Sequence, residues 1–188
     1  MTPLALLRHA DTAWSLEGRI QGRADVPLLR GASCPPLPSA CRGMRVVTSP
    51  LARCVETAAL LGVPDAPREP RLAEMDWGLW EGESLAALRE RLGAEMRENE
   101  ARGLDFTPLG GESPRMLLSR LRTWLQDVAR QGVPTLAITH RGVIRAVLVE
   151  ATGWDMRGKP PAKLDWEAVH LFLLDARGKP AVERLNLR

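Results

Sequence analysis

The chain has 188 residues, 45 % of them hydrophobic, which is enough to bury one substantial core but little for two independent domains. We therefore expect a single domain over residues 1–188. The 26 basic residues nearly balance the 23 acidic ones, so the net charge of +3 predicts neither a nucleic-acid-binding surface nor a membrane-binding patch. The three cysteines have neither the even number typical of a disulfide framework nor the short paired spacing of a zinc site.

The first residues lead directly into an apolar run without the charged start, long apolar segment and cleavage site of a signal peptide. No stretch approaches the ~18 consecutive apolar residues that a membrane-spanning helix requires. Together with unpaired cysteines, which suit a reducing compartment, these features predict a cytoplasmic protein with no membrane partner and no nucleic-acid partner.

Predicted strands and helices alternate along the chain. Apolar runs predict buried strands at 4–7, 44–48 and 133–139, and a closing hairpin of 169–174 and 181–187 around a glycine-containing turn. Helical spacing occurs at 51–61, 85–101, 116–129 and 142–151, with Ser113 as the N-cap and Pro114 as the first residue of the third helix. Three prolines disfavour a helix in 31–43. The alternation predicts an α/β fold with a mostly parallel sheet covered on both faces.

Three polar residues follow predicted strands directly. His9, Ser49 and His140 lie at strand ends, and the long polar loop 10–30 comes after the first of them. Ligands of parallel α/β sheets bind beyond the carboxyl ends of the strands, and long loops at such ends often carry function. We therefore expect these residues to meet on one rim of the sheet.

Arginines accompany two of these residues, which suggests phosphoryl transfer. A neutral imidazole can attack phosphorus and form a phosphohistidine if nearby cations neutralise the phosphoryl oxygens. Arg8, Arg53 and a protonated His140 are candidates for that charge, with His9 as the nucleophile. A single histidine at a strand end could equally be structural or bind a metal. No third ligand at an interpretable spacing is visible, so no metal and no cofactor is expected.

Five blocks of sequence, in order, resemble the motifs of the histidine phosphatase superfamily, the phosphoglycerate-mutase-like proteins. They are Arg8-His9-Ala10-Asp11-Thr12 with 19–22 and 25–28, 48–53 with 56–58, 72–74 with 78–82, 110–113, and Thr139-His140-Arg141-Gly142-Val143-Ile144-Arg145. The resemblance implies a three-layer α/β/α sandwich. It also implies that His9 is the nucleophile, that Arg8, Arg53 and His140 hold the phosphoryl group, and that Glu74 is the general acid and then the base. No metal is required in that mechanism.

The resemblance extends to substrate binding. It suggests that Arg19 and Gln21 face the substrate, and we add Ser15, Gly22 and Arg141 as candidates. Arg145 could face the pocket or the surface, and His170, inside a strand pattern, is interpreted as structural. Among nearby carboxylates, Asp76, Glu81 and Glu83 compete with Glu74 for the role of acid. Trp14, Trp77 and Trp80 could line the pocket mouth or pack in the core.

Three residues depart from the usual motif. Ala10 replaces a glycine, Ser15 replaces an asparagine, and Arg141 replaces a glycine after the second histidine. The compact length resembles the small bacterial phosphatases more than the longer mutases, which predicts a phosphatase acting on a small phosphorylated metabolite. The alternatives are a mutase-type phosphoryl transfer and a catalytically weak domain that binds a phosphate ligand or a phosphoprotein.

Overall fold

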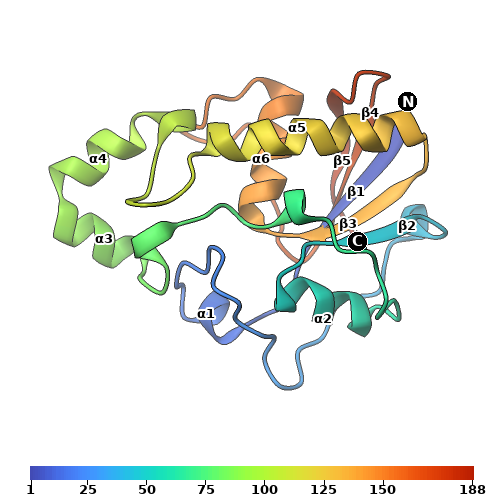
Figure 1. Ribbon diagram of the computed structural model, residues 1–188, viewed down its shortest axis with the longest axis horizontal. Coiled ribbons are helices and arrows are strands. Elements are labelled where there is room, and N and C mark those ends of the chain that lie inside the picture. Colours follow the sequence, from blue (N-terminus) through green and yellow to red (C-terminus); the bar gives the residue numbers. More distant parts are fainter.

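The computed structural model describes all 188 residues and contains one five-stranded sheet of order β2-β3-β1-β4-β5 (Figure 1). The strands are β1 (Thr2–Arg8), β2 (Arg45–Thr48), β3 (Thr135–Thr139), β4 (Val169–Leu174) and β5 (Pro180–Leu187). The α-helices are α1 (Ala13–Leu16), α2 (Ala52–Leu60), α3 (Leu85–Leu92), α4 (Ala94–Glu100), α5 (Pro114–Gln131) and α6 (Arg141–Thr152). Short 3₁₀ turns lie at Ser39–Cys41, Pro70–Leu72, Gly78–Trp80 and Gly103–Asp105.

The centre of the sheet is parallel and one edge is antiparallel. β3 pairs in parallel with β1 on one side and with β2 on the other, whereas β4 runs antiparallel to β1 and to β5. The segment 153–168 returns the chain to the carboxyl end of β1, where Leu6 pairs with His170, so β4 enters the sheet in the opposite direction. The expected parallel arrangement therefore holds for β2, β3 and β1, and the hairpin makes the whole sheet mixed.

Both faces of the sheet are covered. Side chains alternate along β1, so apolar residues of this strand point to each face in turn. Leu4 and Leu6 belong to the largest apolar core, which α5 and α6 share, whereas Ala5 and Leu7 face the opposite side. On that side α2 packs through Cys54 and Ala58. Figure 1 shows α5 above the strands and α2 below them. The expected three-layer α/β/α sandwich is confirmed.

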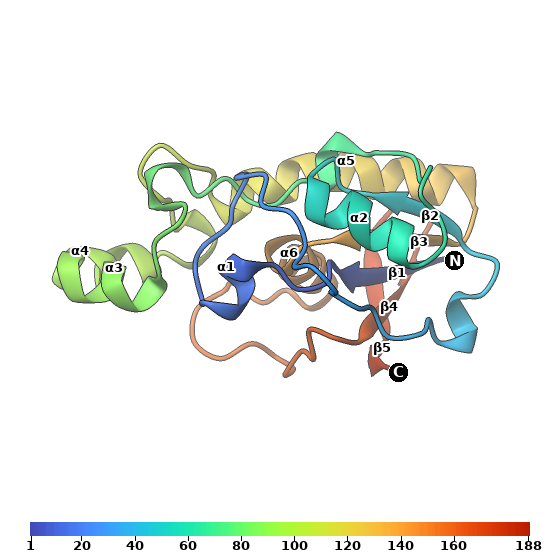
Figure 2. The ribbon, with the colours of Figure 1, turned by 90° about the horizontal axis from the view of Figure 1, so that it is seen from below.

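The expected helix over 85–101 is wrong in one respect, because it is two helices. Gly93 ends α3 and begins α4 with a φ of +52°, a conformation that glycine adopts readily and other residues rarely do. Arg89 and Arg91 occupy the last turn of α3, where cations interact favourably with the helix dipole. Figures 1 and 2 both show this helix pair extending beyond one end of the sheet.

Other local expectations match the structure closely. Ser113 caps α5 by accepting from the N–H of Met116, and Pro114 is the first helical residue. The proline-rich stretch 31–43 contains only one 3₁₀ turn. The loop 10–30 holds one addition, the short helix α1, which Thr12 and Ser15 start with reciprocal side-chain hydrogen bonds. None of the helices combines the length and apolar character needed to cross a membrane.

Candidate active site

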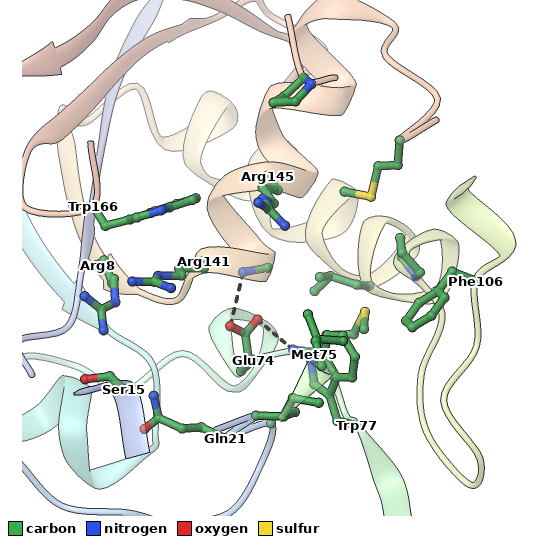
Figure 3. A pocket seen from close by; sticks show the side chains of 18 of the residues that line it. Arg8, Ser15, Gln21, Glu74, Met75, Trp77, Phe106, Arg141, Arg145 and Trp166 are labelled. Carbon is green, nitrogen blue, oxygen red and sulfur yellow. Dashed lines mark hydrogen bonds between the residues drawn. The ribbon is translucent and has the colours of Figure 1, made fainter. Parts of the chain in front are cut away.

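The carboxyl end of β1, the loop 10–30, α2 and the start of α6 contribute to the lining of a pocket of about 630 Å³. Nine of the ten candidate residues line it, and they are Arg8, His9, Ser15, Arg19, Gln21, Gly22, Arg53, Glu74 and Arg141. His140 is the exception, because it lies fully buried behind the pocket wall. Figure 3 shows Arg8 and Arg141 close together, with Glu74 on the neighbouring wall.

His9 presents a neutral imidazole to this pocket. Its Nδ1 lies 2.7 Å from the carbonyl oxygen of Ala10, and because a carbonyl only accepts, Nδ1 carries the proton. Nε2 therefore keeps its lone pair, and it has no hydrogen-bond partner in the protein. Burial, together with the charges of Arg8 and Arg53, lowers the pKa of His9 well below its ordinary value of 6.5. The ring is thus uncharged at neutral pH, as a nucleophile must be.

His140 has the opposite tautomer. Arg53 donates Nε–H to its Nδ1 across 3.3 Å, so Nε2 carries the proton and donates to Oγ of Ser49 at 2.7 Å. Burial, followed by the charges of Arg53 and His9, lowers the pKa of His140 well below 6.5. The expectation of a protonated His140 is therefore wrong. A buried imidazole between cations is neutral, and both of its nitrogens are already bonded.

Two buried arginines stand beside His9. Arg8 is 7 % exposed, its Nη2 pairs with Asp11 at 3.3 Å, and its Nε has no partner at all. Arg53 is fully buried and donates to the carbonyl oxygens of Ala24 and Gly22 at 2.8 and 2.7 Å. Burying a guanidinium with an unpaired N–H is unfavourable unless a ligand completes its shell, and a phosphoryl oxygen would do so.

Glu74 supplies a partly buried carboxyl group to the pocket wall. Its oxygens accept from the N–H of Met75 at 2.9 Å and of Gly142 at 3.1 Å, drawn as dashed lines in Figure 3. Burial raises the pKa of Glu74 above its ordinary 4.5, while the two backbone N–H groups and Arg53 oppose the rise. A Cβ at position 142 would lie 2.2 Å from Oε1 of Glu74, so glycine at this position allows the carboxyl group to keep its place.

Arg120 on α5 positions the loop that carries Glu74. Its guanidinium donates to the carbonyl oxygens of Arg71, Ala73 and Glu74 at 2.5, 2.8 and 3.0 Å. The same group makes two bonds of 2.9 Å to the carboxylate of Glu112. Our sequence analysis missed Arg120, although a glutamate in the motif 110–113 could have indicated that a basic partner exists.

Glu81 binds the backbone of the loop 19–24 rather than acting as an acid. Its carboxylate accepts from the N–H groups of Arg23 at 2.6 Å and Ala24 at 2.9 Å. Gly22 has a φ of +49°, and a Cβ there would lie 1.9 Å from Oε1 of Glu81. Gly22 thus lets the loop approach Glu81 while its carbonyl binds Arg53. The other carboxylates are also engaged elsewhere, since Asp76 caps Gly78 and Glu83 pairs with Arg91.

The remaining candidates, Ser15, Gln21 and Arg19, make different contacts. Oγ of Ser15 bonds within the cap of α1, to Thr12 and to Asp11. Oε1 of Gln21 accepts from Thr12 at 2.8 Å, and Figure 3 shows its side chain along the pocket floor. Arg19 lies at the exposed rim, stacked over Trp14 with 4.5 Å between its Cζ and the ring centroid.

The structure also shows where Arg145 and His170 lie. Arg145 lines the pocket, and so does Trp166, which the sequence analysis did not single out. His170 is buried outside the pocket and accepts from the N–H of Asn186, as a structural histidine would. Ala10 does not have a positive φ, so the glycine usual there is not needed for the backbone conformation.

The sequence of this chain is similar to known proteins. The histidine phosphatase superfamily (branch 1) matches residues 4–188. The chain belongs to the histidine phosphatase superfamily. The Arabidopsis thaliana metal-independent phosphoserine phosphatase is 31 % identical over 178 residues, covering 85 % of this chain and 72 % of the relative. The 2,3-bisphosphoglycerate-dependent phosphoglycerate mutase of Beijerinckia indica is 28 % identical over 191 residues, covering 92 % of each chain.

The solved structures agree on the fold. Phosphoserine phosphatase of Entamoeba histolytica, in complex with 3-phosphoglyceric acid, superposes with a TM-score of 0.79 at 22 % identity, covering 100 % of this chain and 98 % of that one. The family match and the 31 % identical phosphatase confirm the expected membership of the histidine phosphatase superfamily and the expected enzyme class. In this histidine phosphatase no three histidine, cysteine or carboxylate side chains are grouped as metal ligands would be.

Proposed function

We propose that this histidine phosphatase hydrolyses a small phosphomonoester, without a metal, through a phosphohistidine on Nε2 of His9. The observation that carries the proposal is the tautomer of His9. Nδ1 is committed to the carbonyl of Ala10, which leaves an unbonded Nε2 in a pocket lined by arginines and a carboxyl group of raised pKa. A binding module would need the arginines but not the nucleophile or the proton donor.

In the first step the lone pair of Nε2 attacks phosphorus, and the bond between phosphorus and the ester oxygen breaks. Glu74 in its acid form, which burial favours by raising the pKa of the carboxyl group, gives its proton to the departing oxygen. The alcohol leaves, and the imidazole carries the phosphoryl group together with the proton on Nδ1. The carbonyl of Ala10 accepts from that proton throughout.

In the second step water attacks the phosphorus of the phosphohistidine. Glu74, now a carboxylate, takes a proton from the water, the bond from phosphorus to Nε2 breaks, and inorganic phosphate forms. His9 is again neutral and Glu74 is again protonated, so the cycle closes. Arg8 and Arg53 neutralise the phosphoryl oxygens in both steps. His140 acts through Arg53, whose Nε–H it accepts, rather than as a cation.

The similar proteins support hydrolysis of a small phosphorylated metabolite. One relative is a metal-independent phosphoserine phosphatase, and the structurally similar phosphoserine phosphatase of Entamoeba histolytica is in complex with 3-phosphoglyceric acid. The mutase relative favours a test of where the phosphoryl group goes. Release of one phosphate for each ester consumed indicates hydrolysis, whereas a phosphorylated second product indicates transfer.

The deciding experiment is hydrolysis of a chromogenic aryl phosphate in excess chelator by the wild type and by His9→Ala. We expect the wild type to be active and His9→Ala to be inactive, with His170→Gln, a substitution outside the pocket, as the matched control. Equal rates in wild type and His9→Ala would exclude His9 as the nucleophile. Loss of wild-type activity in chelator would instead indicate a metal enzyme.

A second measurement addresses the intermediate. Rapid quenching with a labelled substrate should trap a phosphoenzyme that is stable in alkali and labile in acid, as a phosphohistidine is, and His9→Ala should trap none. An acid-stable adduct would place the phosphoryl group on a different kind of residue. A wild-type protein that binds phosphate but never turns over would favour the binding-domain alternative.

A further inference from the structure

Two arginines of the pocket have no partner for their charge. Arg141 and Arg145 lie four residues apart on α6, so they share one face of the helix, and both line the pocket. Neither side chain forms a hydrogen bond or a salt bridge with any residue of the protein. Figure 3 shows Arg141 beside Arg8 and Arg145 one turn further along α6.

Trp166 holds both side chains in place. The Cζ atom of Arg141 lies 5.1 Å from the centroid of the tryptophan ring and that of Arg145 lies 5.6 Å from it, so both guanidinium groups are within range of a cation–π attraction to this ring. The aromatic ring thus attracts both side chains but supplies neither with a carboxylate partner.

The charge of the pocket is unbalanced. Six arginines line it against two glutamates, and they are Arg8, Arg19, Arg53, Arg89, Arg141 and Arg145 against Glu74 and Glu100. Three of the arginines have carboxylate partners, because Arg8 pairs with Asp11, Arg19 with Glu17 and Arg89 with Glu100. Like charges at this helical spacing repel one another, so the pair on α6 destabilises the free protein slightly.

A phosphoryl group alone does not account for this excess of charge. Arg8 and Arg53 already stand next to His9, where the phosphoryl group would lie, and the charge of Arg141 adds to theirs at the imidazole. Arg145 is a full helical turn beyond Arg141, about 5–6 Å away along the axis. A single phosphoryl group held against His9 would leave Arg145 without a counter-charge.

We propose that Arg141, Arg145 and Trp166 form a second anion-binding subsite beside the phosphoryl site. The substrate class is then a phosphomonoester that carries a second anionic group, a carboxylate or a second phosphate, on the alcohol portion. This inference rests on the proposed phosphatase function. It names three specificity residues, and it explains why Arg141 departs from the glycine usual after the second histidine.

The test compares three aryl phosphates of one shape: 4-carboxyphenyl phosphate, 4-carbamoylphenyl phosphate and 1,4-phenylene bisphosphate. In the wild type we expect kcat/KM for at least one of the two anionic esters to exceed that for the amide by about tenfold or more, as charge-assisted hydrogen bonds would produce. The carboxylate and bisphosphate arms identify which anion the subsite prefers. The preference should weaken as the salt concentration rises.

Substitution then assigns the preference to residues. Arg145→Ala should bring the ratio of anionic ester to amide close to one, and Arg145→Lys, which keeps the charge, should restore part of it. Arg177→Ala removes an exposed arginine of the β4–β5 turn, far from the pocket in the chain, and serves as the control with an unchanged ratio. If Arg141→Ala and Arg145→Ala lower kcat/KM for all three esters equally, the two arginines serve the phosphoryl group and the subsite is refuted.

Failure of the subsite can be distinguished from failure of the phosphatase. A wild type that hydrolyses all three esters equally, in a manner that requires His9, contradicts the subsite and leaves the phosphatase intact. If no ester is hydrolysed, calorimetric titration of His9→Ala with the same three compounds measures their affinities and still tests the subsite. Tighter binding of the anionic esters that Arg145→Ala abolishes would support the subsite, and equal affinities would overturn it.

Discussion

Arg53 donates its Nε–H to Nδ1 of His140, and this one bond determines the protonation of the second histidine of the site. His140 must then carry its proton on Nε2, which faces Ser49. His9, with its ring centroid 5.3 Å away, carries its own proton on Nδ1. Two neighbouring imidazoles thus hold opposite tautomers, one fixed by a side chain and the other by the main chain.

Nitrogen NMR of the histidine rings should show these tautomers directly. We expect His9 as the Nδ1–H form and His140 as the Nε2–H form, both neutral when the pH falls through 6.5, because burial and the adjacent arginines lower both pKa values. In Ser49→Ala the tautomer of His140 should persist, since Arg53 still donates to Nδ1. A His140 that titrates at or above pH 6.5 would contradict this account.

The pH profile should reveal Glu74 as the acid. The first step needs a protonated Glu74, so kcat/KM should fall as the pH rises through its pKa, and the raised pKa places that fall above the range of an ordinary carboxyl group. Glu74→Gln should lower kcat/KM by about 10²–10⁴-fold and remove this limb of the profile. Because both proteins are measured with one substrate, the ionisation of the substrate cancels. An unchanged limb in Glu74→Gln would assign the acid to another group.

Gly142→Ala should damage catalysis more than stability. The new methyl group would displace Oε1 of Glu74, and a catalytic group moved by about 1 Å can lose up to 10²-fold in rate. Alanine favours a helix over glycine by up to about 1 kcal/mol, so the free energy of unfolding should change little. A double-mutant cycle provides the control. In a Glu74→Ala background, Gly142→Ala should have no further effect on kcat/KM, and a full additional loss would contradict the contact.

Arg120→Ala should destabilise the protein and also slow it. Removing this guanidinium leaves the buried carboxylate of Glu112 with only the N–H of Asp76 at 3.4 Å and the more distant Arg23 at 3.7 Å. It also releases three carbonyls of the loop that carries Glu74, at a loss of about 3 kcal/mol. Arg122→Ala, on the same helix, breaks only the pair with Glu150, in which the arginine is exposed, and should lose less than about 1 kcal/mol. Urea unfolding of the two variants measures the difference. Similar losses would mean that the Glu112 pair is no stronger than a surface pair.

Most of the sheet could be predicted from the sequence, because strands and helices carry local signals. The buried run that ends at Arg8, the N-cap Ser113 and the glycine-containing turn after β4 depend on nearby residues only. Gly93 was equally visible, but an amphipathic pattern that continued on both sides of it concealed the break. A glycine within such a pattern is compatible with one helix or two, and its positive φ is known only from the structure.

The charge states of the site could not be predicted in this way. His140 is neutral because it is buried next to Arg53, a residue 87 positions away in the sequence. Arg120 and Trp166 were missed for a related reason. Each acts by contact with elements distant in the chain, the loop of Glu74 for one and the arginines of α6 for the other, and neither belongs to a local motif.

The carbonyl of Ala10 has a consequence for how the proposed reaction handles protons. Since Nε2 of His9 is already without a proton, no base has to prepare the nucleophile, and the first step moves a single proton, from Glu74 to the leaving oxygen. When phosphorus bonds to Nε2 the ring becomes positive, and the dipole of a carbonyl group is already in place on its other side. That dipole belongs to the main chain, so replacement of the side chain at residue 10 does not remove it.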